Sequence, residues 1–480
     1  LFVCVSLKAN EWYYYDTHRW RVSEKGMKLR QQISKRFREI FRDKAVALTT
    51  NRIDSNTENI DEDTNNNETE RLRLLLSRCN MIIARLGSTS EKEKIMTECR
   101  ELYYDSEFLN ELDTNPYLLG CSNGVFDFKE KVFRSGVPED YLSQSTNINY
   151  IKIGPEHESI VSEINDFMSK LFPEESLREY MWDHLASCLM GTSTNQTFNM
   201  YIGKGSNGKS VLIDLMSKVL GDYKGEVPIT LVTTHRNKIG SASPELVSLK
   251  GKRMAVMQEP EENAQINEGI MKELTSGKDP IKGRGLYQAT EVRFLPQFNL
   301  VVASNYFMGV KATDNGTWRR IRSVPFKARF SNNPDPNKEY EFEGDPNIDD
   351  KFDDWKEVFL SILVERACKT NGYVKDCDIV LKDSNDYRKS MDIVTAYIED
   401  NIVKDSNKSI SKTEINHHYN TWHEQNYGTR SSSPKKLHEA INERFGKCVN
   451  TKWKGITFIS YEEDTKEEDA NSLFDQSNED

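Results

Sequence analysis

The stretch G-K-G-S-N-G-K-S at residues 203–210 decides the fold of this chain. It satisfies the phosphate-loop pattern, in which a glycine and four further residues precede Gly-Lys-Ser. The apolar run F-N-M-Y-I at 198–202 predicts a strand ahead of it, and the apolar spacing of 211–220 predicts a helix that ends at Gly221. Glycines let successive backbone N–H groups point at a phosphate, and the helix directs its positive end to the same anion. The sequence therefore predicts a nucleoside triphosphate site.

All eight loop residues are expected to contact the nucleotide: Gly203, Lys204, Gly205, Ser206, Asn207, Gly208, Lys209 and Ser210. The ammonium of Lys209 is predicted to reach the β- and γ-phosphates of ATP. The hydroxyl of Ser210 is predicted to hold Mg²⁺.

A triphosphate site also needs an acidic side chain that arranges Mg²⁺ and water. The run M-A-V-M at 254–257 predicts a strand that leads into Q-E-P-E-E at 258–262. Glu259 lies where the chain leaves the sheet beside the phosphates, so we predict that it activates the attacking water. Glu261 and Glu262 are the alternative, because pairs of glutamates are common on protein surfaces.

Two further polar motifs follow strand-like runs. The run L-V-V-A-S-N predicts a buried strand ending in Asn305, whose amide suits either a hydrogen bond to the attacking water or γ-phosphate, or a turn. Downstream, W-R-R-I places Arg319 and Arg320 before another strand. Arginine stabilises developing phosphoryl charge when a neighbouring subunit supplies it. Two surface arginines, one paired with Asp314, are the alternative.

Between these motifs lies I-K-G-R-G-L-Y at 281–287. Alternating cations, two glycines and an aromatic residue suit a hairpin loop that projects into a channel. There Lys282 and Arg284 would follow a phosphate backbone and Tyr287 would stack on a base. A solvated turn with incidental charge is the alternative.

Composition sets the class of protein. The 480 residues are enough for two to four domains. Charged residues make up 29%, the mean hydropathy is -0.70, and no apolar run approaches the length of a membrane span. The net charge of -11 argues against a uniformly basic coat for nucleic acid, and eight scattered cysteines indicate reduced thiols of an intracellular protein. The chain starts with leucine and without a signal peptide, so we expect a natural N-terminus upstream.

Strand-like runs that alternate with helical stretches predict a multidomain α/β protein with a mainly parallel sheet in its phosphate-loop core. Composition shifts suggest its boundaries. The expected segments are an N-terminal helical segment at 1–50, a disordered insertion at 51–70, a helical domain at 71–191, the phosphate-loop core at 192–345, a helical segment at 346–400, a winged-helix-like module of two helices followed by a β-ribbon at 401–460, and an acidic disordered tail at 461–480.

Taken together, the motifs resemble a known family. The phosphate loop, Q-E-P-E-E, L-T-S-G-K-D-P-I-K-G-R-G-L-Y, V-V-A-S-N and T-W-R-R-I-R occur in the order and spacing of superfamily 3 helicases. The resemblance is to the poxvirus-type primase-helicase branch of large eukaryotic DNA viruses. Upstream, L-L-G-C-S-N-G-V-F-D-F looks like the helical domain that precedes the motor in that branch.

The resemblance implies an AAA+-like core that hydrolyses ATP with Mg²⁺ and assembles as a ring, commonly a hexamer, around single-stranded or forked DNA. It matches Lys209 and Ser210 to the phosphate-loop pair, Glu259 to the second acidic motif and Asn305 to the sensor. It also matches Arg319 or Arg320 to a finger that a neighbouring subunit supplies, and places Lys282, Arg284 and Tyr287 in the pore hairpin.

The chain departs from many related ATPases at Gln258, where they carry a second acidic residue. This leaves Mg²⁺ to Ser210 and water, with Glu259 serving both roles or acting as the base alone. Family members also often carry an upstream primase domain, and primase activity is not assigned to these residues. The resemblance further implies other replication proteins as partners and a place in the host cytoplasm.

Two alternatives from other classes stay open. One is an ATPase that packages DNA or remodels protein with the same loop. The other is a nucleic-acid-binding adaptor with a vestigial ATP site.

Overall fold

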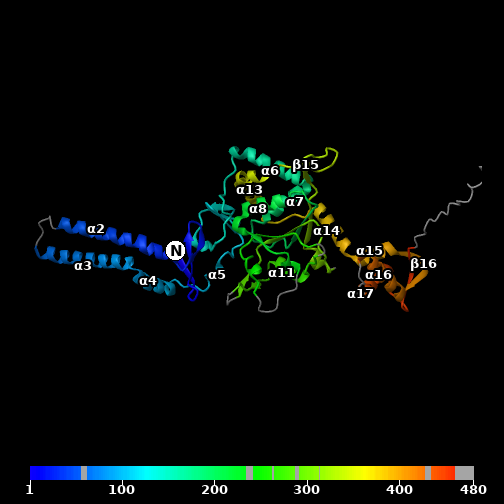
Figure 1. The fold of residues 1–480 in the computed structure, drawn as a ribbon, viewed down its shortest axis with the longest axis horizontal. Coiled ribbons are helices and arrows are strands. Elements are labelled where there is room, and N and C mark those ends of the chain that lie inside the picture. Colours follow the sequence, from blue (N-terminus) through cyan, green and yellow to red (C-terminus); the bar gives the residue numbers. More distant parts are fainter. Residues whose placement is uncertain are drawn as a thin grey trace, which may run out of the picture. The chain divides into compact units, whose positions relative to one another are not determined.

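The computed structural model describes residues 1–55, 62–233, 242–261, 264–286, 291–312, 314–427 and 434–459. The chain divides into two compact units, Leu1–Ser384 and Asn385–Asp480, each with its own apolar core. Figure 1 traces the elements of both in chain order.

The first unit opens with an antiparallel sheet of β1 (Phe2–Ser6), β2 (Glu11–Asp16) and β3 (Arg19–Glu24). The prediction of a helical segment at 1–50 is therefore wrong for residues 2–24. The aromatic and β-branched residues here favour a pleated, half-buried surface, and Trp12 and Trp20 are buried beneath it.

Helices follow: α1 (Met27–Gln32), a π-helical turn (Ile33–Phe37), α2 (Arg38–Ser55), α3 (Glu62–Gly87) and α4 (Thr89–Leu102). Figure 1 shows α2 and α3 running side by side. The disordered insertion predicted at 51–70 is thus helical at 51–55 and 62–70, whereas residues 56–61 lie outside the described residues. A helix pairs its backbone groups within itself, and the buried Ala45 and Cys79 further along the two helices supply apolar contacts that this polar stretch lacks.

The next part of the unit combines helices with a small sheet. After α5 (Phe108–Glu111), the strands β4 (Leu118–Cys121), β5 (Gly124–Asp127) and β6 (Val132–Arg134) pair antiparallel. A two-residue turn at Ser122-Asn123 connects β4 and β5 as a hairpin. Short 3₁₀ turns at Pro138–Asp140 and Pro155–His157 lead to α6 (Glu158–Leu171) and α7 (Glu175–Ser187).

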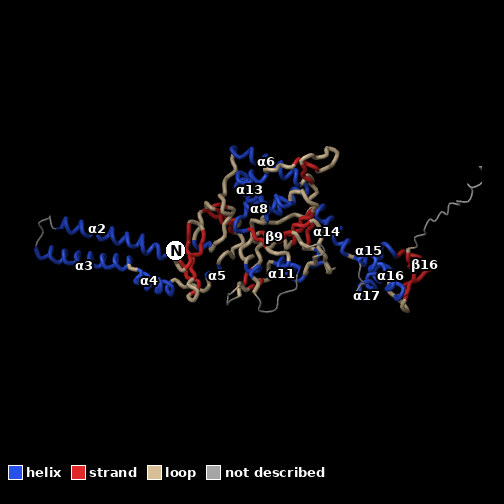
Figure 2. The backbone as a smooth tube through the Cα atoms, in the orientation of Figure 1, coloured by secondary structure: helices blue, strands red, loops and turns tan. Residues whose placement is uncertain are grey.

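A five-stranded parallel sheet lies at the centre of the first unit. Its strands are β7 (Phe198–Ile202), β8 (Lys224–Glu226), β9 (Met254–Gln258), β12 (Asn299–Ser304) and β13 (Ile321–Pro325), in the spatial order β13-β7-β12-β9-β8. β9 and β12 read as nearly continuous apolar runs because both faces of the sheet are covered there. Figure 2 shows α8 (Lys209–Leu220) and α13 (Ile348–Thr370) on one side of the strands and α11 (Glu268–Ser276) on the other. The predicted multidomain α/β fold with a parallel sheet is confirmed.

Shorter elements complete the unit. They are a 3₁₀ turn (Gly221–Tyr223), α9 (Thr230–Thr233), α10 (Pro244–Val247), β10 (Ile281–Gly283), β11 (Val292–Phe294), α12 (Asn315–Trp318), β14 (Arg329–Ser331) and β15 (Glu341–Glu343). α13 packs against α6, α7 and α8, so it joins the helices before the loop to the helix after it. α14 (Asp378–Met391) begins in this unit.

The second unit contains α15 (Ile393–Asn401), β16 (Ile402–Ser411), α16 (Lys412–Tyr427), α17 (Pro434–Phe445) and β17 (Lys452–Phe458). β16 and β17 pair antiparallel. The sequence predicts a ribbon that follows the two helices, yet the first strand of the observed ribbon precedes them. Ile402 and Ile410 are buried at the two ends of a largely polar strand, a pattern too sparse to reveal it in the sequence.

Ser411 and Glu414 form a capping box at the start of α16. Glu414 N donates to Ser411 Oγ at 3.2 Å, and Ser411 N donates to Glu414 Oε2 at 2.7 Å. The predicted acidic tail at 461–480 lies outside the described residues. No helix in the described part of the chain is both long and apolar enough to span a membrane.

Candidate nucleotide-binding site

The glycine-rich loop connects the carboxyl end of β7 to the first residue of α8. Its start is fixed to the neighbouring strand, since Gly203 N donates to the Ser304 carbonyl at 3.3 Å. Its middle is fixed to the segment after β13, since Phe330 N donates to the Ser206 carbonyl at 2.8 Å. The loop is therefore held at both points by main-chain contacts.

The three loop glycines have different surroundings. A Cβ at Gly203 would lie 2.7 Å from the carbonyl oxygen of Phe326. Gly208 has a φ of +79°, and a Cβ there would lie 2.5 Å from Leu171 Cδ1. A Cβ at Gly205 would meet no described atom within 4 Å, so the open side of the loop lies there. Tight backbone packing on one side and open space on the other fit a loop that cradles an anion.

Lys209 has a buried side chain whose ammonium group lies inside the loop. It donates to the Gly203 carbonyl and, at 3.2 Å each, to Asn207 Oδ1 and Asn305 Oδ1. Burial lowers the pKa of Lys209 below its ordinary value. All three acceptors are neutral oxygens, and within the described residues no carboxylate is ion-paired with the ammonium. Its charge thus remains uncompensated, as a phosphate ligand would require.

Asn305 and Glu259 lie at the same edge of the sheet. β9 and β12 run parallel with Gln258 opposite Ala303, and Glu259 N donates to the Ala303 carbonyl at 3.2 Å. Glu259 is exposed and has a φ of +51°, a conformation that side chains other than glycine rarely adopt and that is frequent at functional sites. The structure thus brings Lys209, Asn305 and Glu259 to one edge.

The remaining residues of this edge are placed as follows. Ser210 is exposed in the first turn of α8, beside the loop. Glu261, the alternative acid, is exposed three residues past the end of β9, and Glu262 lies outside the described residues.

Arg319 and Arg320 lie at the opposite edge. They precede β13, whose first residue Ile321 pairs with Phe198 at the start of β7, whereas the loop follows the end of β7. Arg319 is exposed and donates to Gln196 Oε1 at 3.4 Å. Arg320 donates to the Gly316 carbonyl at 2.6 Å, and burial, reinforced by Arg319, lowers its pKa. The structure therefore does not bring these arginines to their own loop.

The segment proposed to follow a phosphate backbone does form a hairpin. β10 and β11 pair antiparallel with Lys282 opposite Arg293, and both side chains are exposed. Arg284 is half-buried, and its main chain exchanges hydrogen bonds with Ser243. Tyr287 lies outside the described residues, so its stacking role stays a prediction.

A cavity of about 380 Å³ adjoins the loop and was missed in the sequence. Its apolar walls are Phe167 of α6, Val211 of α8, Phe330, and Ile348 and Trp355 of α13, and Ser206 and Gly208 form its border with the loop. No motif marks it, because the walls come from segments far apart in the chain that only tertiary packing brings together.

The class defined by this fold and site is an α/β protein with a glycine-rich phosphate-type loop on a parallel sheet. Residues 2–184 match the family model described as "D5 N terminal like". The chain is 32% identical over 456 residues to "Putative helicase L207/L206" of Acanthamoeba polyphaga mimivirus, covering 92% of this chain and 46% of that protein. The resemblance to the primase-helicase branch of large DNA viruses is confirmed at this level: residues 2–184 match the D5 N terminal like model, and the chain is similar to proteins named as helicases and primases of such viruses.

Two other relatives show the range of that homology. "Putative helicase 022R" of Frog virus 3 is 26% identical, and the match covers 95% of this chain and 56% of that protein. "Putative primase C962R" of African swine fever virus is 28% identical, and the match covers 75% of this chain and 38% of that protein. The chain thus spans about half the length of the curated relatives it matches. Among solved structures, the NrS-1 C terminal region (305-718) superposes with a TM-score of 0.40 at 15% identity, covering 69% of this chain and 81% of its own.

Proposed function

We propose that this chain is the motor of an ATP-dependent replicative DNA helicase that works as a ring oligomer. The observation that carries the proposal is the convergence of Lys209, Asn305 and Glu259 at one edge of a parallel sheet, beside a glycine loop with room for an anion. The homology to proteins named as helicases supports DNA unwinding over other uses of such a loop.

In this proposal the loop binds the triphosphate of ATP. Backbone N–H groups between Gly205 and Lys209 and the N-terminus of α8 would receive the phosphate oxygens. The Lys209 ammonium would exchange its three neutral acceptors for the β- and γ-phosphates, which gain a full charge interaction. Ser210 and Glu259 would hold Mg²⁺, which when bound neutralises charge on the phosphates. The cavity beside Ser206, whose lining combines apolar side chains with charged ones, would receive the base.

The chemical step is hydrolysis. Glu259 would accept a proton from the attacking water while the water oxygen bonds to the γ-phosphorus and the bond to the β,γ-bridging oxygen breaks, giving ADP and phosphate. Asn305 would orient the water or the γ-phosphate, because its amide already contacts Lys209.

An arginine would complete the site from a neighbouring subunit. Arg319 and Arg320 precede the start of β13, and an adjacent copy in a ring would direct this edge at the loop. Such a guanidinium stabilises the charge that develops during phosphoryl transfer.

The DNA would contact the β10–β11 hairpin. Lys282 and Arg284 would follow the backbone of a single strand and Tyr287 would stack on a base. Single-stranded and forked DNA are the proposed ligands. Other replication proteins, with a primase domain upstream in a longer chain, are the proposed partners, in an intracellular setting.

A strand-displacement assay tests this function. Forks with a 3′ or a 5′ single-stranded tail are incubated with the protein, with and without ATP. The proposal predicts release of the displaced strand with one tail polarity and only with ATP. Nucleotide hydrolysis without displacement on either fork would instead support a packaging or remodelling ATPase, and absence of both would support an adaptor.

A further inference from the structure

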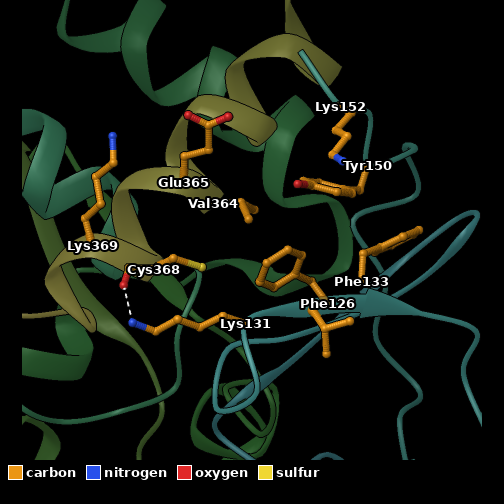
Figure 3. A pocket seen from close by; sticks show the side chains of 10 residues that line it. Phe126, Lys131, Phe133, Tyr150, Lys152, Val364, Glu365, Cys368 and Lys369 are labelled. Atoms are coloured by element: carbon orange, nitrogen blue, oxygen red, sulfur yellow. Dashed lines mark hydrogen bonds between the residues drawn. The ribbon is translucent and has the colours of Figure 1, made fainter. Parts of the chain in front are cut away.

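A second cavity lies between the small sheet and α13, apart from the loop and the hairpin. Its volume is about 750 Å³. Figure 3 shows Phe126, Phe133 and Tyr150 on one side of it and Val364, Glu365 and Cys368 of α13 on the other. Val132 and three lysines, Lys131, Lys152 and Lys369, complete the lining.

The aromatic wall is a packed cluster. The ring centroid of Tyr150 lies 5.2 Å from that of Phe126 and 4.9 Å from that of Phe133. The main chain of Tyr150 is fixed, since its N–H donates to Asn123 Oδ1 at 3.0 Å and its carbonyl accepts from Asn123 Nδ2 at 2.9 Å. Tyr150 and Phe133 remain half-buried, so a ring surface is held in place beside the cavity.

The lysines that line the cavity differ from nearby arginines in their ion pairing. Arg134, beside the cavity on β6, is paired with Asp140 at 2.7 Å, and Arg366 on α13 is paired with Asp183 at 2.6 Å. Lys131, Lys152 and Lys369 are exposed, and within the described residues none of the three forms an ion pair.

Only one of these lysines has a described acceptor. Lys131 donates to the carbonyl of Cys368 at 2.7 Å, which joins the β5–β6 turn to α13. Glu365 is the one acid of the lining. Three unpaired ammonium groups in a chain of net charge -11 form a local positive site against the overall field.

We propose that this cavity, the aromatic–lysine cavity, binds a segment of single-stranded DNA outside the pore hairpin. Bases would stack against Tyr150 and Phe133, and backbone phosphates would contact Lys131, Lys152 and Lys369. Fixed aromatic rings beside a cationic border are how proteins hold single strands without reading their sequence. The choice of DNA as the ligand rests on the proposed function. The aromatic wall favours it over an acidic peptide, which would use the lysines alone.

The test is binding of fluorescein-labelled oligo(dT) of 20 nucleotides to the full chain by anisotropy, without nucleotide and over a range of salt. The variant is Lys152→Glu with Lys369→Glu, both exposed side chains whose replacement leaves the core intact. The control is Lys129→Glu, an exposed lysine in the same turn as Lys131 that does not line the cavity. We expect the double variant to bind at least about 5-fold more weakly, with a salt slope smaller by about 1.4, since each single-strand phosphate contact contributes about 0.7. The control should match wild type.

Equal affinity and slope for the double variant and the control would overturn the proposal. Two competitors without bases separate a single-strand site from a general polyanion site. An abasic 20-unit phosphate chain and poly-glutamate are each titrated against the bound oligo(dT) in the same anisotropy measurement. Weak competition by both supports a single-strand site, and competition as strong as that of unlabelled oligo(dT) contradicts it in favour of a general polyanion site. Because no ATP is present, failure here leaves the helicase proposal standing. Failure of the fork assay leaves this measurement unaffected.

Discussion

Lys209 and Arg319 stand at opposite edges of one parallel sheet. Lys209 follows the carboxyl end of β7, and Arg319 precedes the strand that pairs with the amino end of β7. The five residues of β7 separate the two edges by roughly 13 Å, at about 3.3 Å per residue. Arg319 is also held at its own edge by Gln196, which comes before β7. One chain therefore holds the glycine-rich loop and the two arginines at opposite ends of the parallel strands.

Replacing Lys209 with alanine should abolish ATP turnover, with a loss of at least about 100-fold, because the charge that meets the phosphates is removed. ATP hydrolysis measured by phosphate release checks this. Lys218→Ala is the control, since Lys218 lies on the same helix but is exposed and paired with Asp353. Turnover within a few-fold of wild type in Lys209→Ala would remove the loop from the active site.

Two glycines of the loop should respond differently to alanine. Gly208→Ala should lower the free energy of unfolding by about 1–2 kcal/mol, because its φ of +79° strains any side chain. Gly205→Ala should leave stability unchanged and weaken binding of a fluorescent ATP analogue, because the new methyl group enters the open side of the loop. Thermal unfolding and nucleotide titration of both variants measure the contrast. Wild-type nucleotide affinity in Gly205→Ala would show that the phosphates do not occupy this space.

Lys282→Ala combined with Arg284→Ala should weaken binding of single-stranded DNA and reduce its salt dependence by about 1.4 in slope if both residues contact phosphates. Anisotropy titrations at several salt concentrations give both quantities. Lys278→Ala is the control, because the Lys278 side chain is exposed. Lys250 is less suitable, since its ammonium contacts the Leu109 carbonyl. A slope equal to wild type would remove the hairpin from the DNA path.

His184 should make the first unit less stable in mild acid. Its ring is buried, Nε2 lies 2.8 Å from the Tyr201 hydroxyl, and burial lowers its pKa to about 4 from 6.5. Between these values the unfolded chain binds more protons than the folded chain, so the free energy of unfolding falls as the pH drops from 6.5 towards 4, by up to about 3 kcal/mol. Thermal unfolding between pH 7 and pH 4.5 measures the slope. If the free energy of unfolding of His184→Gln changed with pH as steeply as that of wild type, the acid sensitivity would belong to other groups.

Local signals in the sequence predict the centre of this fold well. The runs at β7, β9 and β12 are mostly apolar, and the polar residues predicted to form the site follow each of them. Because parallel strands place their carboxyl ends at one edge of the sheet, the sequence alone predicts that Glu259, Asn305 and Lys209 lie together. The opposite position of the arginines also follows from chain order, since they precede their strand.

The missed features depend on contacts between distant segments. The N-terminal sheet was taken for helix because its tyrosines and tryptophans give no clear period without knowledge of which side is buried. The strand β16 was missed because its two isoleucines stand eight residues apart among polar residues. The aromatic–lysine cavity joins the turn before β6, the loop at Tyr150 and the end of α13, and no local pattern connects them.

The central claim, a site divided between two subunits, is tested most directly by mixing inactive variants. Glu259→Gln subunits are combined with Arg319→Ala or, separately, Arg320→Ala subunits at several ratios, and phosphate release is measured with single-stranded DNA present. In a ring, random mixing completes about a quarter of the interfaces. Activity in the mixture should therefore rise well above that of either variant alone, and the arginine whose variant is rescued is the finger. No rescue at any ratio with either arginine variant would contradict the account.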